Sequence, residues 1–365
     1  MGTLRVLMAG GGTGGHVIPA LAIARELRDA YGAEVRFVGT ARGLETRLVP
    51  AAGFPLELMR VGQLKNVSLL TRVRTVADLP LGLLRCVELL RSFRPDVVVG
   101  VGGYASGPAM LAAILLGVPT VAFEPNAVPG LANRLVGRWV SAAAVNFEET
   151  RRYFRSARVT GIPVRAEFFG IGARGIGVRA QDGARRLLVF GGSQGARVLN
   201  EMMPKIAAGL LEEFPGLSLV HQTGPRGEVA TRAAYAASGA RADGWQVMAY
   251  LEDMPERFGE ADLVLCRSGA STMAELAAAG KAAVLVPFPQ AADDHQTKNA
   301  AVFAAAGAAE LLVEAEMTPE RLLAALGGLL RDWGRLERMG AQARALAHPD
   351  AVREIGAMVV GLRRG

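Results

Sequence analysis

The sequence predicts an α/β protein made of two Rossmann-like domains, each a doubly wound parallel sheet. Short apolar runs rich in β-branched residues alternate with helical stretches, and this alternation starts again in the second half of the chain. Three glycine-rich loops each follow such a run and precede a helix. A length of 365 residues also gives each of two domains enough chain for its own core.

The individual elements follow from these patterns. In the first half we expect helices over Pro19–Arg28 and Pro108–Leu116, and strands over Leu4–Met8, Glu34–Val38, Val97–Val99 and Thr120–Phe123. In the second half we expect strands over Leu187–Phe190, Leu217–Gln222, Leu263–Cys266 and Ala283–Val286. Gly161 and Pro163 mark Arg158–Arg165 as the linker. The predicted domains are residues 1–160, joined by a C-terminal helix over 350–365, and residues 161–349.

Composition excludes several classes of protein. The net charge is +7, but the basic residues are spread along the chain with few aromatic residues between them, so nucleic acid is not an expected partner. No secretion signal is evident and there are two cysteines, which indicates a cytoplasmic protein with free thiols. No segment is long enough to span a membrane. Metal-ligand spacing and an Asp-x-Asp motif are both missing, so no metal is expected.

The glycine-rich loops span 10–16, 100–107 and 191–196. Glycine allows close backbone approach, and N–H groups at a helix start attract anions, so these loops indicate pyrophosphate binding at the carboxyl ends of strands. The first loop also fits a dinucleotide fingerprint. That fingerprint needs an acidic residue after the next strand, where Gly39–Arg42 stands instead. Arg42 could read a 2′-phosphate, so NADP stays open, whereas no loop continues as a Walker A motif.

Seven motifs occur in order and carry a family resemblance: residues 10–20, 102–108, 124–133, 161–165, 191–196, 266–275 and 293–300. Together they resemble the peptidoglycan N-acetylglucosaminyltransferases of glycosyltransferase family 28. The resemblance implies a GT-B fold, with two domains facing a cleft. It also implies inverting, metal-independent transfer of N-acetylglucosamine from UDP-GlcNAc, a substrate rather than a cofactor, to the C4 hydroxyl of the muramoyl sugar of lipid I. The product would be lipid II.

The resemblance also implies a donor site. Ser193 and Arg165 would hold the diphosphate, where negative charge grows as UDP leaves. Glu275 would accept both ribose hydroxyls; alternatively, it is an acid in a first helical turn, stabilised by the helix dipole. The remaining donor contacts implied are Thr13, Gly14, Gly15, Asn126, Gln194, Gly195, Ser271, Thr272, the Leu251 main chain at uracil, and His295 and Gln296 at the sugar or ribose. The family often has glutamine at both of the last positions, which leaves the role of His295 in doubt.

On the acceptor side, His16 is a candidate general base because histidine titrates near neutral pH. It could instead hold the shape of its loop, in which case Glu124 is the alternative base. Asn126 is a candidate contact to hydroxyls. The acceptor pyrophosphate would meet Gly103, Tyr104 and Ser106.

Lipid I lies in the membrane, so the protein must reach it. The segment Leu64–Phe93 combines leucines with arginines, including Arg72, Arg74 and Arg85, which suits either an interfacial helix or a core helix. The resemblance favours a peripheral position on the inner face of the cell membrane, where other cell-wall synthesis proteins are potential partners. The alternative functions are a UDP-GlcNAc epimerase, another UDP-sugar transferase of the same fold, or a non-catalytic binding module.

Overall fold

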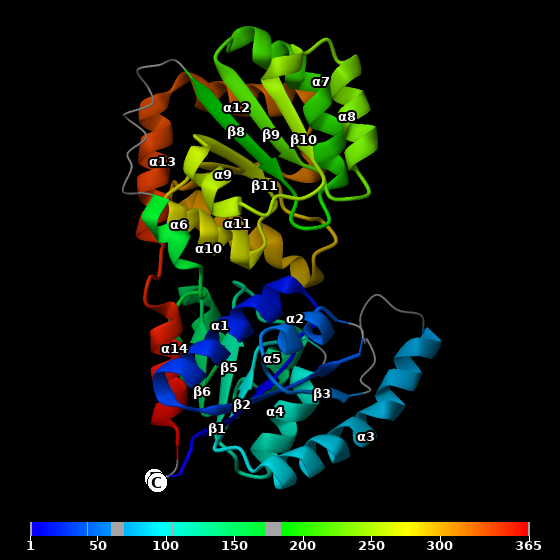
Figure 1. The fold of residues 1–365 in the computed structure, drawn as a ribbon, viewed down its shortest axis with the longest axis vertical. Helices are drawn as coiled ribbons and strands as arrows, with labels where there is room; N and C mark the ends of the chain where they lie inside the picture. The colour runs from blue at the N-terminus through cyan, green and yellow to red at the C-terminus, as the bar shows by residue number, and fades with distance from the viewer. Residues whose placement is uncertain (1, 42, 60–68, 104, 172–183, 364–365) are drawn as a thin grey trace. The chain divides into compact units, whose positions relative to one another are not determined.

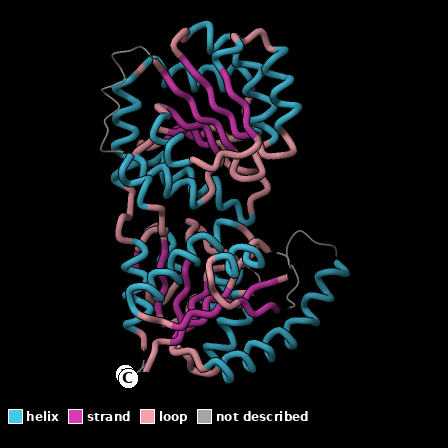
Figure 2. The backbone as a smooth tube through the Cα atoms, viewed as in Figure 1, coloured by secondary structure: helices cyan, strands magenta, loops and turns pink. Residues whose placement is uncertain are grey.

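The computed structural model describes residues 2–41, 43–59, 69–103, 105–171 and 184–363, and between 69 and 79 it describes the backbone only. The chain forms two compact units. One comprises Met1–Pro163 and Asp350–Gly365, and the other comprises Val164–Pro349. Each unit is built on one parallel sheet, seen as two separate groups of strands in Figure 2. The predicted fold class, two Rossmann-like parallel-sheet domains, is confirmed.

The first unit has a seven-stranded sheet in the order β3-β2-β1-β4-β5-β6-β7. Its strands are β1 Arg5–Ala9, β2 Glu34–Thr40, β3 Leu56–Met59, β4 Val97–Gly100, β5 Thr120–Glu124, β6 Ala142–Val145 and β7 Ala157–Val159. Its helices are α1 Gly14–Tyr31, α2 Glu45–Ala51, α3 Leu69–Phe93, α4 Ser106–Leu115, α5 Leu131–Val136 and α14 Ala351–Gly361. The residues of β4 are buried throughout, as expected for a central strand with helices on both faces.

The second unit has a six-stranded sheet in the order β10-β9-β8-β11-β12-β13. Its strands are β8 Arg185–Phe190, β9 Leu217–Gln222, β10 Trp245–Met248, β11 Leu263–Cys266, β12 Ala283–Leu285 and β13 Ala309–Leu311. Its α-helices are α6 Ala166–Ile171, α7 Arg197–Glu213, α8 Glu228–Ala237, α9 Met254–Glu260, α10 Ala270–Ala279, α11 His295–Ala305, α12 Pro319–Arg331 and α13 Trp333–Ala345.

The linker prediction needs one correction. Arg158 and Val159 belong to β7, which pairs with β6 at the edge of the first sheet, and are not part of a linker. The division between the units falls at Pro163 and Val164. A three-residue edge strand offers too little alternation for the sequence to reveal it.

The strand order places the glycine-rich loops. In each sheet the direction of winding reverses next to the first strand of the unit, between β1 and β4 and between β8 and β11. Ligands of open parallel sheets bind at the carboxyl ends of the strands at this switch point. The first two loops follow β1 and β4, and the third follows β8. All three therefore lie at switch points.

The last helix returns to the first unit. Helix α14 packs on α1, as Figure 1 shows, with Ile355 and Val359 fully buried. Gly356 lies close to Tyr31 and Glu26 of α1. Across the described ranges, no helix has both the length and the apolar character needed to cross a membrane.

Candidate active site

The first two glycine-rich loops pack against each other in the first unit. The N–H of Gly10 donates to Val38 O (3.0 Å) and that of Gly11 donates to Gly102 O (3.2 Å). A Cβ on Gly103 would lie 2.3 Å from Gly11 O, so side chains are excluded where the loops meet. Tyr104, predicted at the acceptor pyrophosphate, lies outside the described residues.

His16 lies in the first turn of α1, partly exposed, beside the second loop. Its Nδ1 is 3.3 Å from Thr13 Oγ1. A Cβ on Gly102 would lie only 2.9 Å from His16 Nε2. The imidazole therefore occupies space that is open because residue 102 has no side chain. When Nδ1 carries the hydrogen, with Thr13 Oγ1 accepting it, Nε2 is the basic nitrogen. The structure thus places the predicted base at the switch point of the first sheet.

The position of the imidazole beside Gly102 gives a first prediction. Gly102→Ala should lower kcat on the order of 10- to 100-fold because the added methyl group displaces the imidazole, and UDP affinity should not change. Gly102 has φ +90°, so backbone strain alone must be controlled for. Gly117→Ala is the matched control, because Gly117 has φ +68° and open space around it. Equal kcat losses in the two variants would show that strain, not His16, is responsible.

Glu124, the alternative base, is enclosed at the end of β5 and is 2% exposed. Its Oε1 accepts hydrogen bonds from the backbone N–H and side-chain amide of Asn126 (3.0 and 3.1 Å). Its Oε2 accepts from the N–H of Gly130 (3.0 Å) and the amide of Asn133 (2.9 Å). Burial raises the pKa of Glu124 above its usual range, although these donors oppose that effect. All four contacts shape the loop that carries Asn126.

Ser106 begins α4 and is fully buried. Its hydroxyl faces inward, because a Cβ on Gly100 would lie 2.8 Å from Ser106 Oγ. The Ser106 hydroxyl therefore does not point toward the space where an acceptor would bind. Gly103, also predicted at the acceptor pyrophosphate, is partly exposed.

The third glycine-rich loop projects Ser193 and Gln194 into solvent after β8. The loop is closed by the N–H of Gly195, which donates to Gly192 O (2.8 Å), and by the side chain of Gln222, which donates to the same carbonyl (3.0 Å). Two polar side chains and a tight backbone turn are thereby held ahead of α7. This is the arrangement expected for a phosphate ligand.

Glu275 and Arg165 are electrostatically coupled in the second unit. Burial raises the pKa of Glu275 to about 7, and the charge of Arg165 opposes this increase. Helix α10 begins at Ala270, so Glu275 is in its second turn and the first-turn interpretation is wrong. Ser271 Oγ is buried without a hydrogen-bond partner among the described residues, and Thr272 beside it is partly exposed.

The 291–296 segment has strained backbone next to two predicted donor contacts. Asp293 and Asp294 have φ of 55° and 54°, a conformation that costs free energy in residues other than glycine and is concentrated at functional sites. His295 Nδ1 is 2.8 Å from Ala292 O; a carbonyl only accepts, so Nδ1 carries the hydrogen and Nε2 of the neutral ring is an acceptor. Gln296 Oε1 accepts from the N–H of Phe288 (3.0 Å), which leaves its amide hydrogens to donate.

At the predicted uracil position, Leu251 is buried at 1% exposure while Tyr250 beside it is exposed. Burial of the Leu251 side chain is compatible with the predicted contact, which uses its main chain.

Two supporting residues were not predicted. Arg267 donates to Val286 O (3.1 Å) and Pro287 O (2.9 Å) and pairs with Glu314 (2.6 Å), so it joins the ends of β11 and β12. Glu45 accepts a hydrogen bond from Gly12 in the first loop. No local sequence pattern distinguished Glu45, because its role depends on the first loop lying beside the end of β2.

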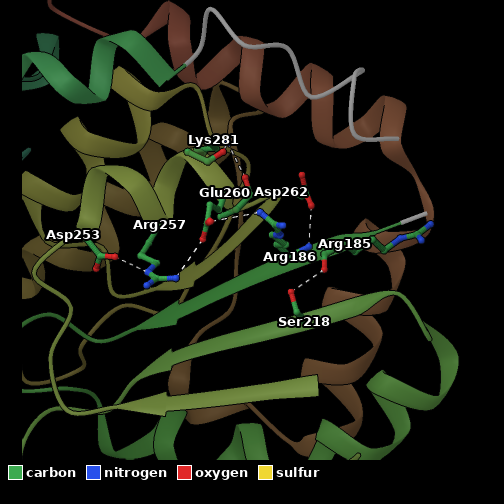
Figure 3. Close-up of polar contacts among 10 residues, drawn as sticks. Arg185, Arg186, Ser218, Asp253, Arg257, Glu260, Asp262 and Lys281 are labelled. Atoms are coloured by element: carbon green, nitrogen blue, oxygen red, sulfur yellow. Dashed lines mark hydrogen bonds and ion pairs between the residues drawn. The ribbon is translucent and has the colours of Figure 1, made fainter. Parts of the chain in front are cut away.

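A separate cavity of about 280 Å³ lies at the amino ends of β8, β9 and β10, opposite the carboxyl ends that carry the predicted site. Figure 3 shows ion pairs of three lining residues: Arg186, at the start of β8, pairs with Glu260 (3.6 Å), which also pairs with Arg257 (3.3 Å). Arg257 in turn pairs with Asp253, which is outside the lining (2.9 Å). These charges balance one another. The amino ends of the strands lie here, and the described residues lining the cavity include none of the predicted site residues.

Comparison with known proteins agrees with the predicted family. Residues 6–145 match the glycosyltransferase family 28 N-terminal domain and residues 186–355 match its C-terminal domain. A UDP-N-acetylglucosamine--N-acetylmuramyl-(pentapeptide) pyrophosphoryl-undecaprenol N-acetylglucosamine transferase of Solibacter usitatus is 45% identical over 349 residues, 95% of this chain and 93% of that protein.

Solved structures agree as well. The crystal structure of MurG from Acinetobacter baumannii is similar, with a TM-score of 0.82 and 33% identity, covering 98% of this chain and 99% of that one. The UDP-GlcNAc 2-epimerase of Neisseria meningitidis has a TM-score of 0.69 and 14% identity, covering 98% of this chain and 100% of that one. This second similarity shows the fold alone.

Proposed function

The chain belongs to glycosyltransferase family 28, and from this premise we propose that it transfers N-acetylglucosamine from UDP-N-acetylglucosamine to N-acetylmuramyl-(pentapeptide) pyrophosphoryl-undecaprenol, or lipid I. The product is lipid II. The observation that carries the proposal is that each unit presents its predicted residues at the switch point of its own sheet. These are His16 beside Gly102 in one unit, and Ser193 and Glu275 in the other.

In this proposal the second unit binds the donor. Glu275 accepts hydrogen bonds from the ribose hydroxyls, and the main chain of Leu251 contacts uracil. Ser193, the N–H groups of its loop and Arg165 stabilise the negative charge that grows on UDP. His295 Nε2 accepts, and the Gln296 amide donates, hydrogen bonds to the hydroxyls of the sugar or ribose.

The first unit activates the acceptor. Nε2 of His16 takes the proton of the C4 hydroxyl of the muramoyl sugar while the hydroxyl oxygen attacks the anomeric carbon of N-acetylglucosamine. The bond from that carbon to UDP breaks on the opposite face, UDP leaves with the electron pair, and the configuration is inverted. Glu124 acts by holding Asn126 rather than by taking a proton, since four donors already occupy its oxygens.

One assay tests the proposal against its alternatives. The protein is incubated with radiolabelled UDP-N-acetylglucosamine, with and without a lipid I analogue. We expect label in the lipid fraction only when the analogue is present. Label in an epimer of the donor would identify an epimerase instead, and label in neither product would indicate a binding module.

We further propose that the first unit contacts the inner face of the cell membrane through α3, α4 and α5. Helix α4 packs on both α3 and α5. Among the side chains that the structure describes, the large apolar ones exposed on or next to these helices are Leu81, Leu84, Leu111, Leu115, Leu116, Leu135 and Trp139. Arg85 and Arg138 are exposed among them. Apolar side chains with basic neighbours suit an anionic bilayer surface. Of the predicted segment Leu64–Phe93, residues 64–68 and the side chains of Arg72 and Arg74 lie outside the described part.

Membrane contact gives a second prediction. Replacing both Leu115 and Trp139 with glutamine should weaken binding to anionic vesicles by at least tenfold, because each large apolar side chain contributes roughly 1.5–3 kcal/mol when buried. Sedimentation with the vesicles measures the change, and activity on a short-chain soluble acceptor should persist. Val229→Gln, at an even more exposed apolar residue of the second unit, is the control. Vesicle binding equal to that of the control would place the membrane contact elsewhere.

A further inference from the structure

Glu45, the first residue of α2, has its carboxylate enclosed against the first glycine-rich loop, and it is 1% exposed. Oε2 accepts a hydrogen bond from the N–H of Gly12 (2.7 Å). Oε1 accepts from the backbone N–H and from the hydroxyl of Thr40, both at 2.9 Å. The carboxylate therefore joins the end of β2 to the loop that follows β1.

Glycine surrounds this carboxylate on three sides. A Cβ on Gly11 would lie 2.4 Å from Glu45 Cδ, one on Gly39 would lie 2.7 Å from Cγ, and one on Gly43 would lie 1.9 Å from Oε2. None of these positions accepts even a methyl group without displacing the carboxylate. The glycines in and around the first loop make it resemble a phosphate-binding loop. At least some of them are instead needed to leave space for the side chain of Glu45.

The carboxylate is ionised at neutral pH. Burial raises the pKa of Glu45, but the hydrogen bonds from Gly12 and Thr40 outweigh it, and the pKa lies below its usual value. The Gly12 N–H thus already donates its hydrogen bond to an anion, the carboxylate of Glu45. A phosphate placed next to it would be repelled by that charge, so this part of the loop is unsuited to pyrophosphate.

The same loop carries the proposed base. The His16 N–H donates to Thr13 O (3.1 Å), and Thr13 Oγ1 lies 3.3 Å from the imidazole Nδ1. On its other side the loop is bonded to the second loop, through the Gly11 N–H and Gly102 O. The backbone that sets the position of the imidazole is therefore held between Glu45 and Gly102.

We propose that Glu45 is a positioning residue for His16: its carboxylate takes the place of a bound anion in the first glycine-rich loop and holds that loop in its working shape. This proposal rests on the proposed function, in which His16 takes the acceptor proton.

Glu45→Gln tests it, because glutamine keeps the shape of the side chain but turns an NH₂ donor toward one of the donors that Glu45 satisfies. We expect kcat to fall on the order of 10- to 100-fold with UDP affinity within about twofold of the parent. The imidazole ¹H–¹⁵N signals of His16 should shift while those of the other three histidines stay in place. The matched control is Glu57→Gln, an exposed carboxylate on β3, which should change none of these.

Thr40→Val removes one hydroxyl donor and leaves the carboxylate, so it should shift the same His16 signals with a smaller loss of kcat. It keeps the proposal testable if Glu45→Gln does not fold, and in that case unshifted His16 signals in Thr40→Val would overturn it. Unchanged kcat and His16 signals in folded Glu45→Gln would also overturn it, as would equal losses of kcat and UDP affinity. The histidine spectra need no turnover. They therefore test the loop separately from the proposed function, which fails if the parent transfers no label to lipid.

Discussion

His16→Ala should lower kcat on the order of 10²- to 10⁴-fold while the affinity for UDP stays that of the parent, because a general base acts in the transition state and not in donor binding. The loss is measured at saturating donor and acceptor, with UDP affinity from calorimetry. The acidic limb of the kcat/KM profile should disappear in the variant, since that limb reports protonation of the base.

Glu124→Gln is the comparison that separates the two candidate bases. It should be milder, because the carboxylate is enclosed by four donors and acts through Asn126. If turnover survives in His16→Ala, or if the acidic limb persists there and disappears in Glu124→Gln, then the histidine only shapes its loop and the carboxylate is the base.

Glu275→Ala should weaken UDP binding roughly 10- to 150-fold, which corresponds to charge-assisted hydrogen bonds worth about 1.5–3 kcal/mol. Removing the 2′-hydroxyl from the ligand should cost the variant less than it costs the parent, because the partner of that hydroxyl is already gone. Glu212→Ala, which removes an exposed carboxylate on α7, is the control for net charge. Equal losses for 2′-deoxy-UDP in parent and variant would contradict the ribose assignment.

The pKa of about 7 adds a pH dependence to UDP binding. Ribose hydroxyls donate to the ionised carboxylate, so the ligand favours the deprotonated form of Glu275. Affinity should then be complete above pH 7 and fall by up to about tenfold per pH unit below it. Glu275→Gln supplies the baseline, because it retains the titration of the UDP phosphate but not that of residue 275. Parallel profiles in the parent and the glutamine variant would contradict the prediction.

The sequence was informative wherever one short segment carried its own signal. Apolar runs such as Val97–Val99 predicted strands, and each glycine-rich loop predicted a strand-to-helix turn. The observed strand order then places these turns at the switch points. The edge strands β3, β7, β10 and β13 and the alanine-rich β6 were not recognised, because three or four residues show little alternation and alanine favours helices.

The local sequence pattern could not predict the direction in which the candidate side chains point. Ser106 fits a ligand-binding loop by type, yet its hydroxyl is turned toward Gly100. Glu124 stands at a strand end as a catalytic acid would, and only the fold brings Gly130 and Asn133 to its oxygens. The partners of Glu45 are Gly12, in the loop after β1, and Thr40, at the end of β2, so its role depends on β1 and β2 being neighbours.

The return of α14 makes the second unit an insertion within the first. The first unit needs Asp350–Gly365 to complete it, and the whole of Val164–Pro349 is synthesised in between. About 320 residues separate α1 from α14. At about 5–20 residues per second, the apolar face of α1 that α14 covers is therefore left bare for roughly 16–64 s, while the second unit is free to fold. Nascent chains of this protein therefore depend on a chaperone, or on the solubility of an unfinished domain, until α14 is made.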